Sequence, residues 1–254
     1  MGALHEGHLS LIRECKKEND FTIASIFVNP IQFNNADDFA KYPNVLDRDL
    51  ELLREEGCDA VFAPSASEMY PVPPQTKFNF GSLETVLEGA FRPGHFSGVA
   101  IVVSKLFHIV NPHVAYFGQK DLQQTLVVKQ LVRDLQFPLI LKVCDTVREE
   151  DGLAMSSRNV RLTPEFRKVA PQLFSSMIKI KETIVNGGSV IPHVRYITGE
   201  IKRIKGVRIE YLEAVDTQFL LPIKDDYIGE VAICVAGYFG EVRLIDNIVF
   251  HKAS

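Results

Sequence analysis

Apolar and polar residues alternate along the first 146 residues in a way that predicts strands and helices in turn. Runs rich in β-branched and aromatic residues predict strands at 21–29, 58–64, 113–118 and 139–145. Apolar residues at helical spacing predict helices at 8–19, 46–57, 97–110 and 121–135. This alternation, with nearly continuous apolar strands, is typical of a parallel α/β sheet with helices on both faces.

The pattern changes near residue 147. Residues 147–163 are polar and rich in turn formers, and a helical stretch then runs from Thr163 to about Val185. After a break at Gly187 and Gly188, a second helix runs to about Ile204, and three strands follow at 208–216, 230–240 and 242–250. We therefore predict an α/β domain at 1–146 and a smaller α+β domain at 147–254.

Composition narrows the class of protein. Apolar residues make up 46% and charged residues 24%, and the net charge is −4, which fits a globular chain without the electrostatic footprint of a nucleic-acid binder. A local basic cleft stays possible. The four cysteines form no CxxC pair and fit a reducing compartment. Without a membrane-length apolar run or a basic leader, we expect a cytoplasmic protein with no nucleic-acid or membrane partner.

His5 and His8 lie three residues apart at the start of a predicted helix, with Gly2 and Gly7 close by in the sequence. At that spacing the two imidazoles share one helix face. A helix N-terminus offers free N–H groups and a positive dipole end, which favour phosphate. The alternatives are two solvated histidines or half of a zinc site, although no Cys/His cluster supplies further zinc ligands.

Further polar groups follow the predicted strand ends. Lys120 and Asp121 follow the strand that ends at Gly118, where parallel sheets bind ligands, but Asp121 could simply cap a helix. The loop at 155–158 could clamp phosphate or connect two domains. Three other groups could be site residues or parts of ordinary turns and helix faces: Arg92 with His95, Asn29 with Gln32, and the carboxylates of Asp37, Asp38, Asp47 and Asp49, which could hold Mg²⁺.

Taken together, these segments resemble a known family. HEGH at 5–8 and MSSR at 155–158 are similar to the HIGH-type and KMSKS-type motifs of the nucleotidyltransferase superfamily. Six segments in order resemble the pantoate–β-alanine ligases: MGALHEGHLSL, FVNPIQF, ADDFAKYPNVLDRDL, FRPGHFSGV, YFGQKDLQQ and DGLAMSSRN. The resemblance covers residues 1 to about 165. It implies a Rossmann-like, nucleotidyltransferase-type sheet at 1–146 that binds ATP and pantoate, with a C-terminal lid domain at 147–254.

The resemblance also implies an activity, which is ATP-dependent condensation of pantoate with β-alanine to give pantothenate. Pantoyl adenylate would be the intermediate, and AMP and pyrophosphate would be released. Mg²⁺ would accompany ATP, and the protein would be a homodimer. The alternatives are another adenylyl- or cytidylyltransferase of the superfamily and an inactive nucleotide-binding protein.

Residue roles carry over from the same resemblance. Catalytic roles fall on His5, His8, Lys120, Ser156, Ser157 and Arg158. ATP would be bound by these residues together with Met1, Gly2, Ala3, Leu4, Glu6, Gly7, Gly118, Gln119, Asp121, Val147 and Met155. Pantoate would be bound by Gln32 and Gln124 and the pocket lined by Asn29, Tyr42, Arg92 and His95. Asp49 is the candidate metal ligand.

Two departures from the family pattern carry expectations of their own. The lysines of a KMSKS motif are absent from AMSSRN, so Arg158 and Lys120 would supply the cationic charge. Members of the family also carry some tens of residues ahead of MGALHEGH, which include the first strand of the sheet. We therefore expect the 254-residue chain to have low stability or to aggregate, and to be restored by an upstream segment.

Overall fold

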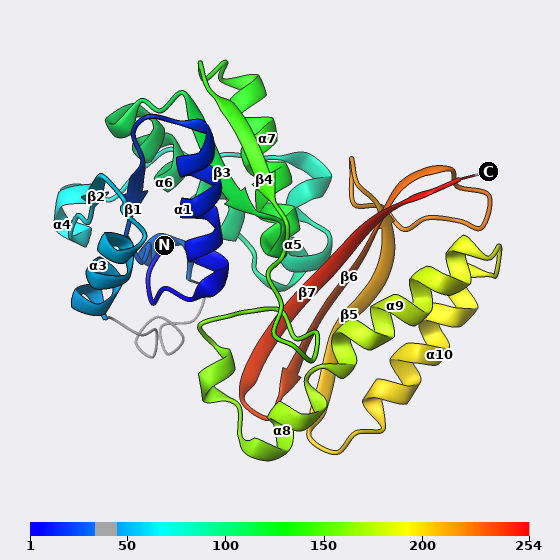
Figure 1. Ribbon diagram of the computed structural model, residues 1–254. Helices are drawn as coiled ribbons and strands as arrows, with labels where there is room; N and C mark the ends of the chain where they lie inside the picture. Colours follow the sequence, from blue (N-terminus) through cyan, green and yellow to red (C-terminus); the bar gives the residue numbers. More distant parts are fainter. Residues whose placement is uncertain (34–44, 254) are drawn as a thin grey trace. The chain divides into compact units, whose positions relative to one another are not determined.

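The structure is a computed structural model that describes residues 1–33 and 45–253 (Figure 1). The chain divides into two compact units. The first comprises Met1–Thr85 and Gly89–Val147, and the second comprises Val86–Glu88 and Arg148–Ser254. The short stretch Val86–Glu88 thus groups with the C-terminal part of the chain. A single boundary between residues 146 and 147 does not predict this.

In the first unit the strands pair in parallel, as the alternating pattern predicts. β1 (Ile23–Ser25) pairs with β2 (Ala60–Phe62), and β3 (Val114–Gly118) pairs with β4 (Ile140–Cys144). Among the described residues these are two separate two-stranded sheets. β1 is shorter than its apolar run because the next residues bond elsewhere, and the Phe27 N–H donates to the carbonyl of Met1 at 3.0 Å.

The main helices of the first unit lie where the spacing of apolar residues predicts them. They are α1 (Glu6–Glu18), α3 (Leu46–Glu55), α6 (His95–Val110) and α7 (Leu122–Asp134). Two short helices were not predicted, α4 (Ala66–Met69) and α5 (Leu87–Phe91). α6 buries side chains on most of its surface, which fits its nearly continuous apolar sequence, whereas α1 buries only Leu9 and Ile12.

A core joins the start of the chain to the first strand pair. Leu4, Leu9 and Ile12 pack with Ala24, Ile26 and Leu53, and each of these side chains is less than a tenth exposed. α1 also contacts β3. This packing fixes α1 against β1 and α3, and together with the contact between α1 and β3 it positions the elements that carry the candidate site.

The second unit is the predicted α+β arrangement. β5 (Val207–Asp216), β6 (Gly229–Phe239) and β7 (Val242–Lys252) form an antiparallel sheet in that order. α9 (Gln172–Val185) and α10 (Val190–Lys202) pack on this sheet (Figure 1). The single helix predicted from Thr163 is divided into α8 (Pro164–Val169) and α9, because Pro171 cannot donate a backbone hydrogen bond within a continuous helix.

Glu88 explains why its segment groups with the second unit. This side chain is 8% exposed, and its carboxylate accepts hydrogen bonds from the Tyr211 hydroxyl at 2.8 Å and from the Arg243 guanidinium at 2.6 and 2.9 Å. Arg243 also pairs with Glu210 at 2.7 Å. A buried carboxylate that is fully paired is costly to break, so the segment stays attached to β5 and β7.

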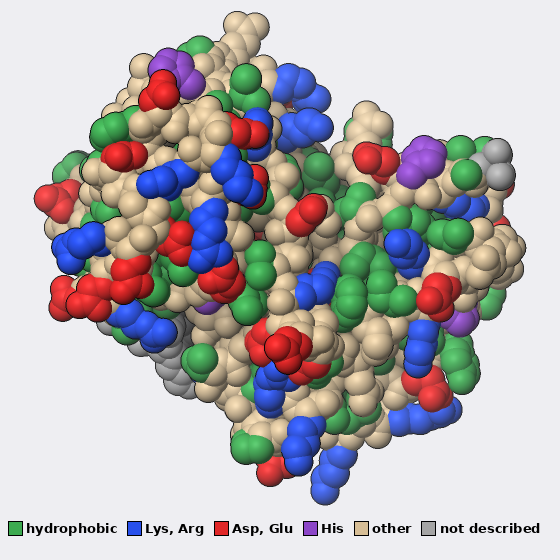
Figure 2. All heavy atoms as spheres, viewed as in Figure 1, with side chains coloured by type: hydrophobic (Ala, Val, Ile, Leu, Met, Phe, Trp, Pro, Cys, Tyr) green, Lys and Arg blue, Asp and Glu red, His purple; other side chains and the backbone are tan. Residues whose placement is uncertain are grey.

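The described surface carries charge of both signs. On the face seen in Figure 2, Lys and Arg side chains are interspersed with Asp and Glu, in keeping with a net charge of −4. No helix among the described residues combines the length and the apolar character that crossing a bilayer requires.

Candidate active site

The two histidines lie at the first turn of α1. The carbonyl of His5 accepts the backbone N–H groups of His8 at 2.7 Å and of Leu9 at 3.2 Å, which starts the helix. The backbone N–H of His5 in turn donates to Nδ1 of His8 at 3.3 Å, and the ring centroids are 4.1 Å apart. Because Nδ1 of His8 accepts this bond, its proton must reside on Nε2. The two imidazoles therefore share one face, as the spacing predicts.

Burial keeps both histidines neutral. It lowers the pKa of His5 to about 4, where the nearby Lys120 lowers it further and Asp121 opposes. Burial also holds the pKa of His8 well below its usual value, with further lowering by His5 and Lys120. The Nδ1 atom of His5 is buried and has no hydrogen-bond partner in the described part of the chain. A neutral imidazole with an unpaired buried nitrogen is a group that a ligand could satisfy.

Lys120 and Asp121 lie beyond the carboxyl end of β3, as the sequence predicts. Gly118 ends the strand, and Gln119–Asp121 forms a 3₁₀ turn that leads directly into α7. Since Lys120 and Asp121 act electrostatically on His5, the structure brings the strand end and the start of α1 together. Lys120 and the two histidines at the start of α1 therefore form a corner in which a cation lies beside a helix N-terminus, an arrangement of the kind that binds phosphate. Gln124 follows in the first turn of α7 and is half-buried.

Asp49, the candidate metal ligand, is buried and bonded to the backbone ahead of α1. This carboxylate on α3 is 1% exposed. Its Oδ2 accepts the N–H of Ala3 at 2.8 Å and its Oδ1 accepts the N–H of Leu4 at 2.7 Å. Ala3 has a left-handed backbone with φ of 51°, which is uncommon for a residue other than glycine. Asp49 thus holds the turn that leads into α1 through both of its carboxylate oxygens.

Other acidic groups near the site are also engaged. The guanidinium of Arg13 pairs with the carboxylates of Glu6 and Glu56, so Glu6 brings no uncompensated negative charge to the start of α1. Within the described ranges, no three His, Cys, Asp or Glu side chains gather as a metal site. Tyr42, Asp37 and Asp38 lie outside the described residues.

Asn29 and Gln32 lie in and beside the 3₁₀ turn Pro30–Gln32 that follows β1. The Gln32 carbonyl lies 2.8 Å from Nδ1 of His95 and accepts from Arg92 at 3.4 Å, which joins the predicted FRPGH turn to this segment. Asn29 is 2% exposed, and its Nδ2 donates to Oε1 of Gln32 at 3.1 Å. Three of the six predicted substrate residues therefore surround a fourth, Gln32.

The predicted clamp loop lies in the second unit. A bridge between Arg148 and Ala154 and a hydrogen bond from the Asn159 side chain to the carbonyl of Ala154, at 3.0 Å, shape it. The hydroxyl of Ser156 accepts the backbone N–H of Arg158 at 3.2 Å. Met155, Ser156, Ser157 and Arg158 are all partly exposed, while Leu153 and Ala154 are buried beneath them. Val147 is the last residue of the first unit.

Sequence reasoning missed two residues of this region. The hydroxyl of Tyr70, just after α4, donates to Oδ1 of Asn29 at 2.8 Å. Gly98 of α6 lies against Ile31, where an added Cβ would be 2.7 Å from the Ile31 carbonyl oxygen. The one sequence signal for Tyr70 was the Ser65–Glu68 capping box, which positions the short helix before it.

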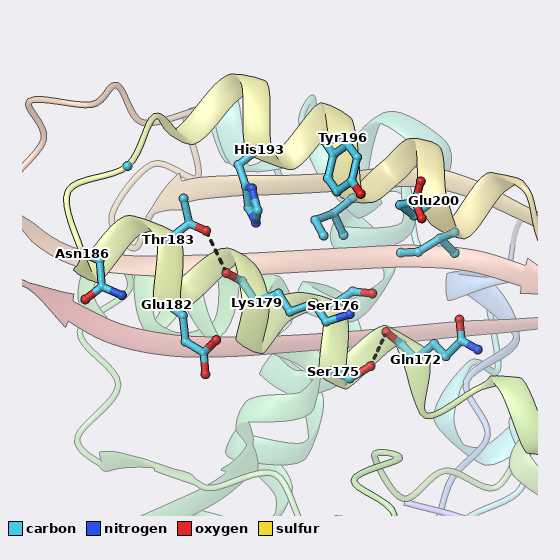
Figure 3. A pocket seen from close by; sticks show the side chains of 13 residues that line it. Gln172, Ser175, Ser176, Lys179, Glu182, Thr183, Asn186, His193, Tyr196 and Glu200 are labelled. Atoms are coloured by element: carbon cyan, nitrogen blue, oxygen red, sulfur yellow. Dashed lines mark hydrogen bonds between the residues drawn. The ribbon is translucent and has the colours of Figure 1, made fainter.

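A separate groove of about 710 Å³ lies between α9 and α10 (Figure 3). His193 of α10 points toward α9, and Tyr196 of α10 together with Lys179 and Glu182 of α9 also lines the groove. None of the predicted site residues lines this groove. It is therefore a feature of the second unit alone, distinct from the residues considered above.

Known proteins match this chain over nearly its whole length. The sequence model of the family described as pantoate-β-alanine ligase matches residues 1–249. The pantothenate synthetase of Cytophaga hutchinsonii is 48% identical over 252 residues, which cover 98% of this chain and 89% of that protein. The pantothenate synthetase of Thermus thermophilus is 49% identical over 249 residues, which cover 98% of this chain and 90% of that protein.

Solved structures show the same likeness. A crystal structure of pantothenate synthetase from Thermus thermophilus matches with a TM-score of 0.92 and 48% identity, covering 98% of this chain and 90% of that one. A pantoate-β-alanine ligase from Francisella tularensis, complexed with β,γ-ATP and β-alanine, matches with a TM-score of 0.78 and 37% identity, covering 99% and 87%. These matches confirm the predicted α/β fold and the family resemblance.

Proposed function

The chain belongs to the pantoate–β-alanine ligase family of enzymes, and we propose that it joins the carboxylate of pantoate to the amine of β-alanine in two steps driven by ATP. The observation that supports this most strongly is the corner of His5, His8 and Lys120, which lies within a family match over residues 1–249. The Francisella tularensis relative is complexed with β,γ-ATP and β-alanine, ligands of the two kinds that this reaction requires.

In the first step, a carboxylate oxygen of pantoate attacks the α-phosphorus of ATP. The bond from that phosphorus to the bridging oxygen breaks, and pyrophosphate leaves with the electron pair to give pantoyl adenylate. Such a transfer depends on positioning and on stabilising the developing negative charge. The start of α1, the N–H of neutral His5 and His8, and the ammonium of Lys120 supply that stabilisation. Gly118, Gln119 and Asp121 would hold the ribose and phosphates beside them.

In the second step, the unprotonated amine of β-alanine attacks the acyl carbon of pantoyl adenylate. The acyl C–O bond breaks, AMP leaves with the electron pair, and the new amide nitrogen gives up a proton. Neutral His5 is suited to donate or accept hydrogen bonds at the phosphate groups, because its pKa of about 4 leaves the imidazole uncharged at neutral pH.

The family resemblance assigns further ATP contacts to the clamp loop. Ser156, Ser157 and Arg158 offer two hydroxyls and a guanidinium for the phosphates, and Val147 and Met155 offer apolar contacts for adenine. Arg158 and Lys120 would together supply the charge that lysines supply in KMSKS motifs.

Pantoate would be bound mainly through the amide groups of Gln32 and Gln124. Since His95 and Arg92 contact the Gln32 carbonyl and Asn29 contacts its side chain, these three residues would support Gln32 more than they touch substrate. Mg²⁺ would arrive bound to ATP and keep most of its waters. We assign no step to a protein-held ion.

The homodimer and the cytoplasmic location also belong to this proposal. The dimer is supported by the family resemblance alone, and sedimentation at several protein concentrations would test it. Four cysteines without a disulfide, one of them buried, support a reducing compartment. Cell fractionation would test the location.

An omission experiment tests the proposed reaction. We expect AMP formation to require ATP, pantoate and β-alanine together. With β-alanine left out, pantoate should still support exchange of labelled pyrophosphate into ATP, because the first step is reversible. Another nucleotidyltransferase would release pyrophosphate without a need for pantoate, and an inactive nucleotide-binding protein would bind ATP without exchange. If leaving out pantoate or β-alanine does not reduce AMP formation, the proposal is wrong.

A further inference from the structure

The amide of Asn29 has a fixed orientation. Its Nδ2 lies 3.2 Å from the backbone carbonyl of Gly98, which can only accept a hydrogen bond. The NH₂ end of Asn29 must therefore face Gly98. The close approach of α6 makes this possible, because Gly98 has no Cβ to collide with the Ile31 carbonyl.

This orientation determines the direction of the two neighbouring hydrogen bonds. The remaining atom, Oδ1 of Asn29, can only accept, so the Tyr70 hydroxyl at 2.8 Å must donate to it. The other hydrogen of Nδ2 points to Gln32 at 3.1 Å, so the Gln32 atom on that side must be the acceptor Oε1. A directed chain thus runs from Tyr70 through Asn29 to Gln32.

The hydrogen-bond chain ends at Gln32 with a donor group. Once Oε1 of Gln32 accepts from Asn29, its NH₂ group is directed away from Asn29, and no acceptor for it lies in the described part of the chain. The backbone of Gln32 is held independently, through its carbonyl, by His95 and Arg92. The backbone contacts set where Gln32 lies, whereas the Tyr70–Asn29 chain sets which end of its amide is presented.

We propose that Tyr70 is a positioning residue for substrate binding, because it completes a hydrogen-bond chain that makes Gln32 present an N–H donor to an anionic oxygen of the acid substrate. This inference rests on the proposed function. The group recognised is a carboxylate oxygen of a small hydroxy acid. Burial raises the pKa of Tyr70 to about 12, so the hydroxyl remains a donor throughout the working pH range.

The first test compares Tyr70→Phe with Tyr116→Phe. Tyr116 is the control, because its hydroxyl is likewise bonded to side chains, Asn19 at 2.8 Å and Glu18 at 2.7 Å, but it lies outside this hydrogen-bond chain. We expect Tyr70→Phe to raise KM for pantoate about tenfold, the scale of one lost hydrogen bond, with KM for ATP unchanged. Tyr116→Phe should change neither. Equal changes in both KM values, or none, would overturn the inference.

A second variant tests the direction of the Gln32 amide and does not depend on Tyr70→Phe folding well. Gln32→Glu keeps an acceptor toward Asn29 but replaces the outward NH₂ with a carboxylate oxygen. If Gln32 presents a donor, this variant should lose at least about 100-fold in kcat/KM for pantoate, from repulsion of the substrate carboxylate. If Gln32 instead presents an acceptor to a hydroxyl, Gln32→Glu should retain most of its affinity, and the inference fails.

A double variant links the two residues. If Tyr70 acts only through Gln32, adding Tyr70→Phe to Gln32→Glu should reduce pantoate kcat/KM by less than about twofold further, while independent roles would multiply. The wild-type enzyme distinguishes failure of the proposed reaction from failure of this role for Tyr70. Absence of any pantoate-dependent AMP formation would overturn the proposed function and this inference with it, whereas normal turnover with an unaltered pantoate KM in Tyr70→Phe would overturn this inference alone.

Discussion

The two parts of the site in the first unit use different chemistry. Around the start of α1, charge and burial dominate, with Lys120, two neutral histidines, and a buried carboxylate that holds the backbone. Around Gln32, neutral amides and a tyrosine hydroxyl form a directed chain. The first arrangement stabilises charge that changes during a reaction, and the second recognises the shape and polarity of a small molecule. Variants should therefore affect turnover or ATP binding in the first region and pantoate binding in the second.

The largest effect should come from Lys120→Ala. Removing one preorganised cation from the phosphate corner should lower kcat by at least about 100-fold, the scale of losing one transition-state donor. Steady-state kinetics with all three substrates would measure it. Lys129→Ala, on the exposed face of the same helix that Lys120 precedes, is the control and should be active. A near-wild-type kcat for Lys120→Ala would show that Lys120 does not stabilise charge during the reaction.

Asp49→Asn should weaken the same region through the backbone. Its amide offers one acceptor in place of two, so either Ala3 or Leu4 loses a buried hydrogen bond, at a cost of about 1–3 kcal/mol. We expect a lower urea midpoint and a weaker affinity for ATP, with the affinity for pantoate much less affected. The exposed Asp47→Asn in the same helix turn is the matched control. If Asp49 were chiefly a Mg²⁺ ligand, excess Mg²⁺ would rescue Asp49→Asn.

Gly98→Ala tests the second region, the neutral hydrogen-bond chain around Gln32. The new Cβ would lie 2.7 Å from the carbonyl oxygen of Ile31, so the turn that carries Gln32 must shift, at a cost of about 1–3 kcal/mol. Affinity for pantoate should fall more than affinity for ATP. Gly199→Ala in α10 meets no atom within 4 Å, and it should be neutral or slightly stabilising. An unchanged pantoate KM in Gly98→Ala would show that the approach of α6 does not position Gln32.

The smallest effect should be the dependence of stability on pH. His5 has a pKa of about 4 in the folded protein and an ordinary value near 6.5 when unfolded, so between these values the unfolded chain binds more protons. Stability should be complete above about pH 6.5 and decrease as the pH falls toward about 4, by on the order of 1 kcal/mol at about pH 5 after allowing for partial exposure. Urea titrations of the wild type and of His5→Gln would measure the difference. Parallel curves would exclude His5 as a cause.

Local patterns predicted much of the fold. The spacing of apolar residues placed α1, α3, α6 and α7 correctly, because a helix face is determined within a few residues. Strand lengths were predicted less well, and β1 has three residues where the apolar run has nine, because pairing partners decide where a ladder ends. The break at Pro171 was present in the sequence, but the strong helical pattern on both sides concealed it.

For the candidate site, the sequence by itself determined which chemical groups are present and which follow a helix start or a strand end, as with His5, His8 and Lys120. It did not determine what each group faces. Asp49 holds backbone N–H groups 45 and 46 residues away, and Tyr70 bonds Asn29 across 41 residues. Such contacts arise only when helices pack on strands, since their partners share no local periodicity. The family resemblance supplied the activity, and the tertiary structure decided which side chains support the reacting groups.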